Sequence, residues 1–123
     1  MSMYLRFLSA VLADKSSSPY KQLDATELQL LEHALLADNR DEQLLVGDIL
    51  YLRKFGSQAT LHGRIKSLVR HGYFKLVLDK EDGRKKHIIL TKMAHKYDGL
   101  MSEHLASAAE GIYGEKNVSI SSK

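Results

Sequence analysis

Apolar residues recur at the spacing of a helix along most of this chain of 123 residues. Such spacing places them on one face of each helix, where they can pack against a core. The pattern predicts helices over 4–12, 24–37, 44–52, 58–71 and 92–113. The apolar positions with helical spacing in the first, second and fourth of these helices are Leu5, Leu8, Val11 and Leu12, then Leu28, Leu31, Leu35 and Leu36, and finally Leu61, Ile65 and Leu68.

Capping residues indicate where several of these helices begin and end. Asp24 and Glu27 have the spacing of a capping box, in which each side chain bonds a free backbone amide of the first turn. Gly56 permits a tight turn, and Ser57 is a good N-cap for the helix that follows it. Gly72 can take the left-handed conformation that ends that helix. The stretch from 44 to 72 therefore predicts two helices joined by a turn.

The helical period stops at Tyr73, and a β-hairpin is expected instead. The strands predicted are 74–78 and 87–90, since both are short and rich in β-prone residues. Asp82-Gly83 is a strong turn signal within the long connection 79–86, which therefore forms a protruding tip. Thr91 then caps the last helix, and residues 114–123 are expected to form a flexible tail.

These elements together predict an α+β, mostly helical fold, the winged helix-turn-helix. It combines a two- or three-stranded antiparallel wing with helices at both ends. One domain is expected over 1–113, which comprises an N-terminal helix and loop (1–22), a core with its wing (23–91) and a C-terminal helix (92–113).

Charge is distributed unevenly along the chain, although its net value is only +3. Residues 1–52 carry four Lys/Arg against eight Asp/Glu, whereas residues 53–92 carry eleven against three. A basic block beside acidic ones suits a protein that presents one surface to phosphates. The alternative is an ordinary solvated charged face, and charge alone does not decide between the two.

The helix over 57–71 has a polar face that favours the first alternative. Opposite its apolar stripe lie donors, cations and very small residues, and no Asp or Glu occurs from Gly56 to Lys75. Short side chains beside cations allow a helix to approach base edges in a major groove. The DNA contacts expected from this helix and the turn before it are Lys54, Ser57, Gln58, Thr60, His62, Gly63, Arg64, Lys66, Ser67 and Arg70.

The expected hairpin tip adds a second basic group, formed by Arg84, Lys85 and Lys86. An arginine on such a tip can enter a neighbouring minor groove, where the potential is negative. Asp82 is expected to pair with Arg84 or to cap the turn, since a carboxylate facing phosphates would be repelled. The wing, residues 79–87, is therefore predicted to contact the minor groove.

In order and spacing, these segments resemble the MarR family of winged-helix regulators over about residues 23–105. The residues that carry the resemblance are the stretch from Gly56 to Tyr73, then Asp82, Arg84 and Lys86 in the wing, and Leu90-Thr91 at the start of the helix after it. The resemblance implies a transcription regulator, most often a repressor, that binds duplex DNA as a homodimer. A palindromic operator and a small-molecule effector are also implied.

Homodimerisation through the chain ends gives Leu5, Leu8, Leu12, Tyr97, Leu100, Met101 and Leu105 as interface residues. Burial of the same residues within one subunit is the alternative. The first helix is short and no extra helix follows residue 113, so the dimer platform usual in this family is expected to be reduced.

Other functional classes find less support in the sequence. No nucleophile motif or phosphate-binding loop occurs, so no enzymatic activity and no cofactor are predicted. Without cysteine, and with no close pair among histidines 33, 62, 71, 87, 95 and 104, no metal site is expected either. No apolar run is long enough for a membrane span, and the cytoplasm is the expected compartment. The remaining alternative is a winged-helix module for protein–protein interaction in a DNA-associated assembly.

Overall fold

The structure is a computed structural model that describes the backbone of residues 1–122 and the side chains of residues 1–110. The chain forms two compact units, one made of Met1–Gln22 with Tyr97–Lys123 and the other of Leu23–Lys96. Within the residues described, no helix combines the length and apolar character that crossing a membrane requires.

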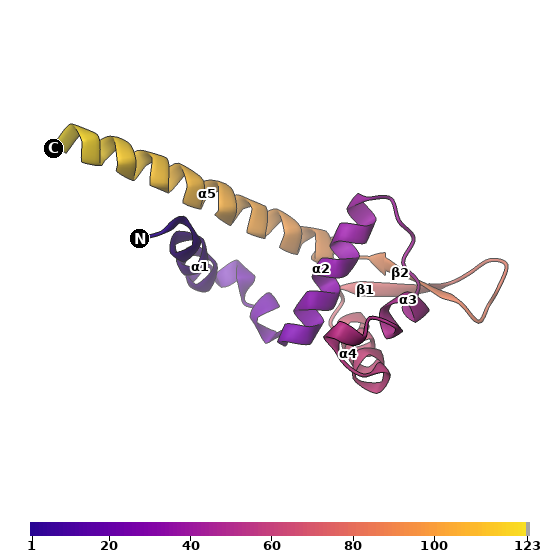
Figure 1. Cartoon of the computed structure of the whole chain (residues 1–123). Coiled ribbons are helices and arrows are strands. Elements are labelled where there is room, and N and C mark those ends of the chain that lie inside the picture. The colour runs from indigo at the N-terminus through magenta and orange to yellow at the C-terminus, as the bar shows by residue number, and fades with distance from the viewer. Residues whose placement is uncertain (123) are drawn as a thin grey trace. The chain divides into compact units, whose positions relative to one another are not determined.

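The second unit is a winged helix-turn-helix, as predicted (Figure 1). It contains α2 (Ala25–Asn39), α3 (Val46–Leu50), a 3-10 turn (Arg53–Phe55), α4 (Gln58–Arg70) and the antiparallel strands β1 (Phe74–Leu78) and β2 (Lys86–Leu90). The hairpin of β1 and β2 extends beyond the helices of this unit (Figure 1).

The core of this unit follows the predicted stripe of α4. Leu61, Ile65 and Leu68 are each at most 2% exposed, and the burial of each contributes roughly 1.5–3 kcal/mol. They meet Leu30 and Leu31 of α2 in a core that continues through Ile49, Tyr73 and Phe74. The expected caps are present too, including the capping box of α2, the Ser57 N-cap, and Gly72 with φ +88°.

Leu36 keeps the helical period of α2, but its side chain is 54% exposed. Leu30, which was not expected in the core, is fully buried in its place. The buried face of α2 runs through Glu27, Leu30, Leu31, Ala34 and Ala37. Leu36 lies well away from that face on a helix with 3.6 residues per turn.

Helix α3 is shorter than predicted, because the residues before it join the sheet. Leu45 forms an isolated antiparallel bridge with His87, and the Ile88 amide donates to the Leu44 carbonyl at 2.8 Å. The wing therefore has two strands, and the possible third strand is reduced to the single bridge at Leu45. Lys86, expected in the connection, is instead the first residue of β2 and pairs with Leu78.

The first unit contains α1 (Met3–Ala13), 3-10 turns at Lys15–Ser17 and Tyr20–Gln22, and most of α5 (Lys92–Ser122). Thr91 caps α5 as predicted, since its Oγ1 accepts from the Ala94 amide at 3.4 Å. The predicted helix end near residue 113 is wrong, because α5 continues to Ser122. The side chains of the expected flexible tail, 114–123, lie outside the described residues.

Candidate nucleic-acid interface

Helix α4 presents a continuous polar face to solvent, opposite its buried stripe. The exposed residues are Gln58, Ala59, Thr60, His62, Gly63, Lys66 and Arg70. All but Ala59 were predicted DNA contacts, and Ala59 was predicted on the same face. Gly63 has open space where a Cβ would stand, with no atom within 4 Å. This face can therefore come close to another surface, and its two cations face solvent.

Two predicted contacts on α4 are turned toward α2 instead. Ser67 is 9% exposed, and its hydroxyl donates to Glu27 Oε2 at 2.7 Å. The prediction of Ser67 as a DNA contact is wrong, since a buried hydroxyl engaged with a carboxyl group cannot meet a base. The Arg64 guanidinium is half-buried, and its Nε lies 2.7 Å from Asp24 Oδ2. Arg64 thus has an ionic partner within the protein.

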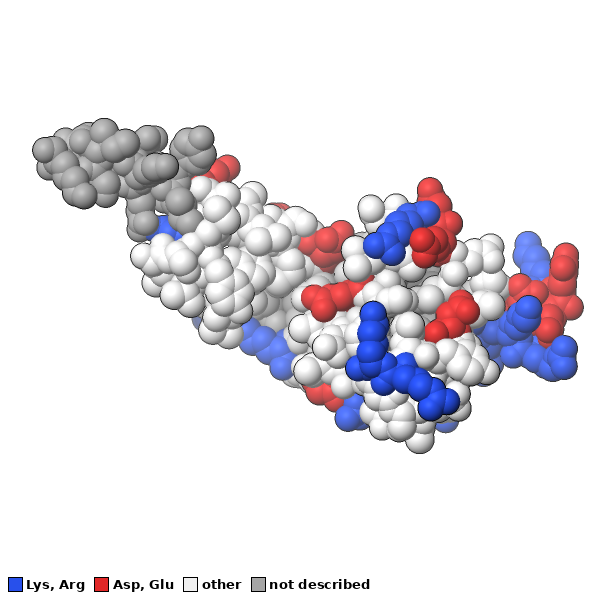
Figure 2. Space-filling view, viewed as in Figure 1, with Lys and Arg blue, Asp and Glu red and all other residues white. Residues whose placement is uncertain are grey.

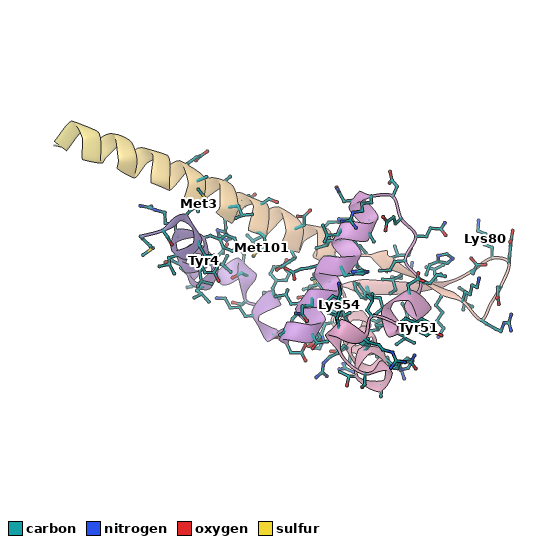
Figure 3. The ribbon with its side chains drawn as sticks, in the orientation of Figure 1. Met3, Tyr4, Tyr51, Lys54, Lys80 and Met101 are labelled. Atoms are coloured by element: carbon teal, nitrogen blue, oxygen red, sulfur yellow. The ribbon has the colours of Figure 1, made fainter. Side chains whose placement is uncertain are left out.

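The turn before α4 is also exposed. Lys54 lies in the 3-10 turn with its Nζ 5.0 Å from the Phe55 ring centroid, while Ser57 accepts from the Thr60 amide at 3.2 Å. Sequence reasoning missed two neighbours of Lys54, the exposed side chains of Tyr51 and Arg53. Figure 3 shows Tyr51 and Lys54 on the segment between α3 and α4. The adjacent cations Arg53 and Lys54, just after Tyr51, were the available signal for a basic turn.

Asp79 organises the loop of the hairpin through both of its carboxylate oxygens. Oδ2 accepts from the amides of Glu81 (3.1 Å) and Asp82 (2.9 Å), and Oδ1 lies 2.7 Å from His87 Nε2. These hydrogen bonds, the one with His87 foremost, lower the pKa of Asp79 to about 2. The base of the loop is closed by the Asp79 amide, which donates to the Lys85 carbonyl at 2.9 Å.

Arg84 is held at the tip by Asp82, as predicted. Its Nε donates to Asp82 Oδ1 at 3.1 Å, and the Arg84 amide donates to the same oxygen at 3.0 Å. These bonds to Arg84 lower the pKa of Asp82. The arginine side chain is nevertheless 91% exposed, so it is oriented without being covered. Lys85 and Lys86 are exposed as well.

Figure 2 shows basic side chains at several places on this unit. One group lies over the segment between α3 and α4, and another lies at the end of the hairpin, where acidic side chains sit beside it (Figure 2). Two of the acidic residues there, Asp79 and Asp82, are engaged in the hydrogen bonds just described. Lys80 lies at the far end of the hairpin (Figure 3).

The residues predicted for a dimer interface fall into two groups in the first unit. Leu5, Leu12 and Leu105 are exposed, while Leu8, Leu100 and Met101 are half-buried. Figure 3 shows Met101 on α5 and two further apolar side chains, Met3 and Tyr4, on α1. Tyr97 differs, because it is buried within one chain and packs edge-on against Tyr20 with ring centroids 5.0 Å apart. The prediction of Tyr97 as an interface residue is therefore corrected.

Among the described residues, no group of three or more His, Asp or Glu side chains is placed to hold a metal ion. Two of the histidines, His87 and His95, have separate carboxylate neighbours. His87 pairs with Asp79, and His95 Nε2 lies 4.0 Å from Asp38 Oδ2.

Several solved structures are similar to this one. A MarR-like transcriptional regulator from Thermotoga maritima has a TM-score of 0.66 at 16% identity, over 98% of this chain and 82% of that one. BpsR from Bordetella bronchiseptica, whose DNA binding is regulated by 6-hydroxynicotinic acid, has 0.53 at 20% identity, over 96% and 81%. The adhesin competence repressor AdcR from Streptococcus pyogenes has 0.51 at 25% identity, over 79% and 64%. No family model and no curated protein matches the sequence.

These similarities show that the chain has the MarR-like winged-helix fold that its sequence resembled. In that fold α3 and α4 form the helix-turn-helix, and β1 and β2 form the wing.

Proposed function

We propose that this chain, with its MarR-like winged-helix fold, is a transcription regulator that binds double-stranded DNA and acts as a repressor. The observation that carries the proposal is the exposed face of α4, which has Lys66 and Arg70 beside small and polar residues. No acidic residue interrupts the chain from Gly56 to Lys75. A helix with such a face fits a major groove about 12 Å wide and can bring side chains to base edges.

Each element of the helix-turn-helix and wing has its own part in the proposed complex. Helix α4 lies in the major groove, and the hairpin residues 79–87 reach the adjacent minor groove with Arg84. The exposed segment around Lys54 contacts phosphates, which fix the register of the protein on the duplex without selecting sequence.

The protein acts as a homodimer in this proposal. Leu5, Leu12 and Leu105 are large apolar side chains exposed on the first unit, and burying them against a second copy removes them from water. The two-fold symmetry of such a dimer requires an operator with two inverted half-sites. The DNA binding of BpsR is regulated by a small molecule, and a small-molecule effector is part of the proposal for this chain as well.

Selection from a pool of random duplexes with the full chain tests the proposal. The expected result is an inverted repeat whose half-site centres lie about one helical turn apart. Binding should also weaken by about 10³-fold or more between about 50 and about 200 mM salt, the loss expected for six or more phosphate contacts. A chain that selects no duplex and binds none at low salt would contradict the proposal and favour the protein–protein interaction module.

A further inference from the structure

The capping box of α2 is joined to α4 by both of its side chains. Asp24 uses Oδ1 to accept from the Glu27 amide at 2.7 Å, and its Oδ2 lies 2.7 Å from Arg64 Nε. Glu27 uses Oε1 to accept from the Asp24 amide at 3.1 Å, and its Oε2 accepts from the Ser67 hydroxyl at 2.7 Å. Each carboxyl group therefore caps its own helix with one oxygen and holds α4 with the other.

The two contacts on α4 come from residues three positions apart, which lie on the same side of a helix. Both contacts lie along one edge of the apolar stripe of Leu61, Ile65 and Leu68, which packs into the core. Apolar packing is non-directional, so it resists separation of α2 and α4 more than a rotation of α4 about its axis. A hydrogen bond depends steeply on distance and angle, so the one from Ser67 to Glu27, together with the ion pair of Arg64 and Asp24 one turn away, fixes that rotation.

A capping box by itself does not require the second pair of contacts. Its helix-starting bonds use one oxygen of each side chain, and the other oxygen would ordinarily face water. Glu27 is instead only 6% exposed, so its second oxygen depends on Ser67 for a partner inside the protein. On the other side of Ser67, His71 Nδ1 lies 2.8 Å from the Ser67 carbonyl oxygen and ties the last turn of α4 to the same residue.

We propose that Asp24 and Glu27 are positioning residues, which set the rotation of α4 and so aim its exposed face at the base edges. This inference rests on the proposed function of α4 as the DNA-reading helix. Its consequence is that loss of either contact weakens sequence-specific binding more than non-specific binding, because phosphate contacts tolerate a rotated helix better than base contacts do.

Two variants separate this positioning from any direct contact with DNA. Ser67→Ala removes a buried hydroxyl without changing charge. Asp24→Asn keeps a good N-cap but weakens the ion pair with Arg64, and it makes the protein more positive. Electrostatics alone would strengthen the binding of Asp24→Asn to DNA, so a weakening would point to geometry. Matched controls are Ser107→Ala on the exposed side of α5 and Asp41→Asn, since Asp41 has φ +56° and asparagine tolerates that conformation.

Binding is measured by fluorescence anisotropy on two labelled duplexes, one selected by the wild-type chain from a random pool and one with the same bases scrambled. Ser67→Ala is expected to lose about tenfold in affinity for the selected duplex, the factor of one lost buried hydrogen bond. Asp24→Asn is expected to lose less, because its ion pair with Arg64 is partly exposed. For the scrambled duplex, Ser67→Ala should stay within about twofold of the wild type, and Asp24→Asn should bind at least as tightly as the wild type because of its added positive charge. Folded variants with unchanged affinity, or with equal losses on both duplexes, would overturn the proposal.

A second measurement keeps the test independent of the proposed function. In a double-mutant cycle of Glu27→Gln and Ser67→Ala, urea unfolding midpoints should be non-additive, since the two side chains share one contact. If the wild type selects no duplex, the proposed function fails and the cycle alone decides whether the contact holds α4. Additive effects would overturn the inference in either case.

Discussion

Asp79 and His87 meet across the base of the hairpin, with Asp79 Oδ1 2.7 Å from His87 Nε2. His87 pairs with Val77 in the sheet and also forms the bridge to Leu45. One carboxyl group thus connects the loop that carries Arg84 to the strand that anchors the wing. The shape of the tip therefore depends on the charge state of Asp79.

Acid should weaken the hairpin through this group. The pKa of Asp79 is lowered from 3.8 to about 2, mainly by the hydrogen bond with His87 and then by those from the amides of Asp82 and Glu81. A carboxyl group whose pKa is lower in the folded state stabilises the protein above pH 3.8, and this contribution is lost as the pH falls through about 2. Urea midpoints measured across that window should fall less steeply for Asp79→Asn than for the wild type. Parallel curves would contradict the prediction.

Gly63→Ala should stabilise the protein and yet weaken DNA binding. A Cβ at this helical position meets nothing within 4 Å, so the free energy of unfolding should rise by roughly 1 kcal/mol from the better helix propensity. The added methyl stands on the face proposed to approach DNA, where overfilling a contact costs about 1–3 kcal/mol, or roughly 5- to 150-fold in affinity.

Gly99→Ala is the matched control for that substitution. Gly99 is also a helical glycine with open space around it, but it lies on α5. We expect the same rise in urea midpoint with unchanged affinity for the selected duplex. Gly63→Ala binding as tightly as the wild type would show that this face of α4 does not approach DNA closely.

Removing single cations should separate DNA contacts from ordinary surface charge. Lys66→Ala is expected to lower the slope of log affinity against log salt by about one, because one phosphate contact is lost. Arg84→Ala should weaken binding about tenfold or more, since it also leaves Asp82 without its partner and facing phosphates. Arg40→Ala is the control, since it removes an exposed cation just after α2 and should change neither the salt slope nor the affinity. Similar effects for all three substitutions would show that DNA binding depends on net charge alone and not on these particular contacts.

Local signals explain why much of this fold was readable from the sequence. The stripe of Leu61, Ile65 and Leu68 follows from helical period alone, and the caps at Asp24 and Ser57 depend on residues within one turn. The exposed polar side of α4 then follows as the side opposite this stripe.

Long-range contacts explain what could not be predicted. Ser67 finds its partner 40 positions earlier in the chain, so nothing near it in sequence marks it as buried. Residues 44 and 45 continue a helical pattern but are drawn into the sheet by β2, which shortens α3. Leu36 is apolar and keeps the helical period of α2, yet its side chain is exposed, because an apolar residue near a helical stripe need not lie on the buried face of the helix.

Charge introduced on the first unit should break the proposed dimer. Leu12 is 61% exposed and α1 buries no residue of its own, so Leu12→Glu should leave the fold of one chain intact. In a dimer the same carboxylate would be desolvated against apolar side chains, at a cost of several kcal/mol.

Sedimentation velocity should therefore show a dimer for the wild type and mainly monomer for Leu12→Glu, with affinity for the selected duplex falling as the second half-site is lost. Leu36→Glu is the control, because Leu36 is 54% exposed but lies on α2 in the other unit. It carries the same change in charge and should remain dimeric. If Leu36→Glu dissociates and Leu12→Glu does not, the subunits meet through the DNA-binding unit, and the interface proposed for α1 and α5 is wrong.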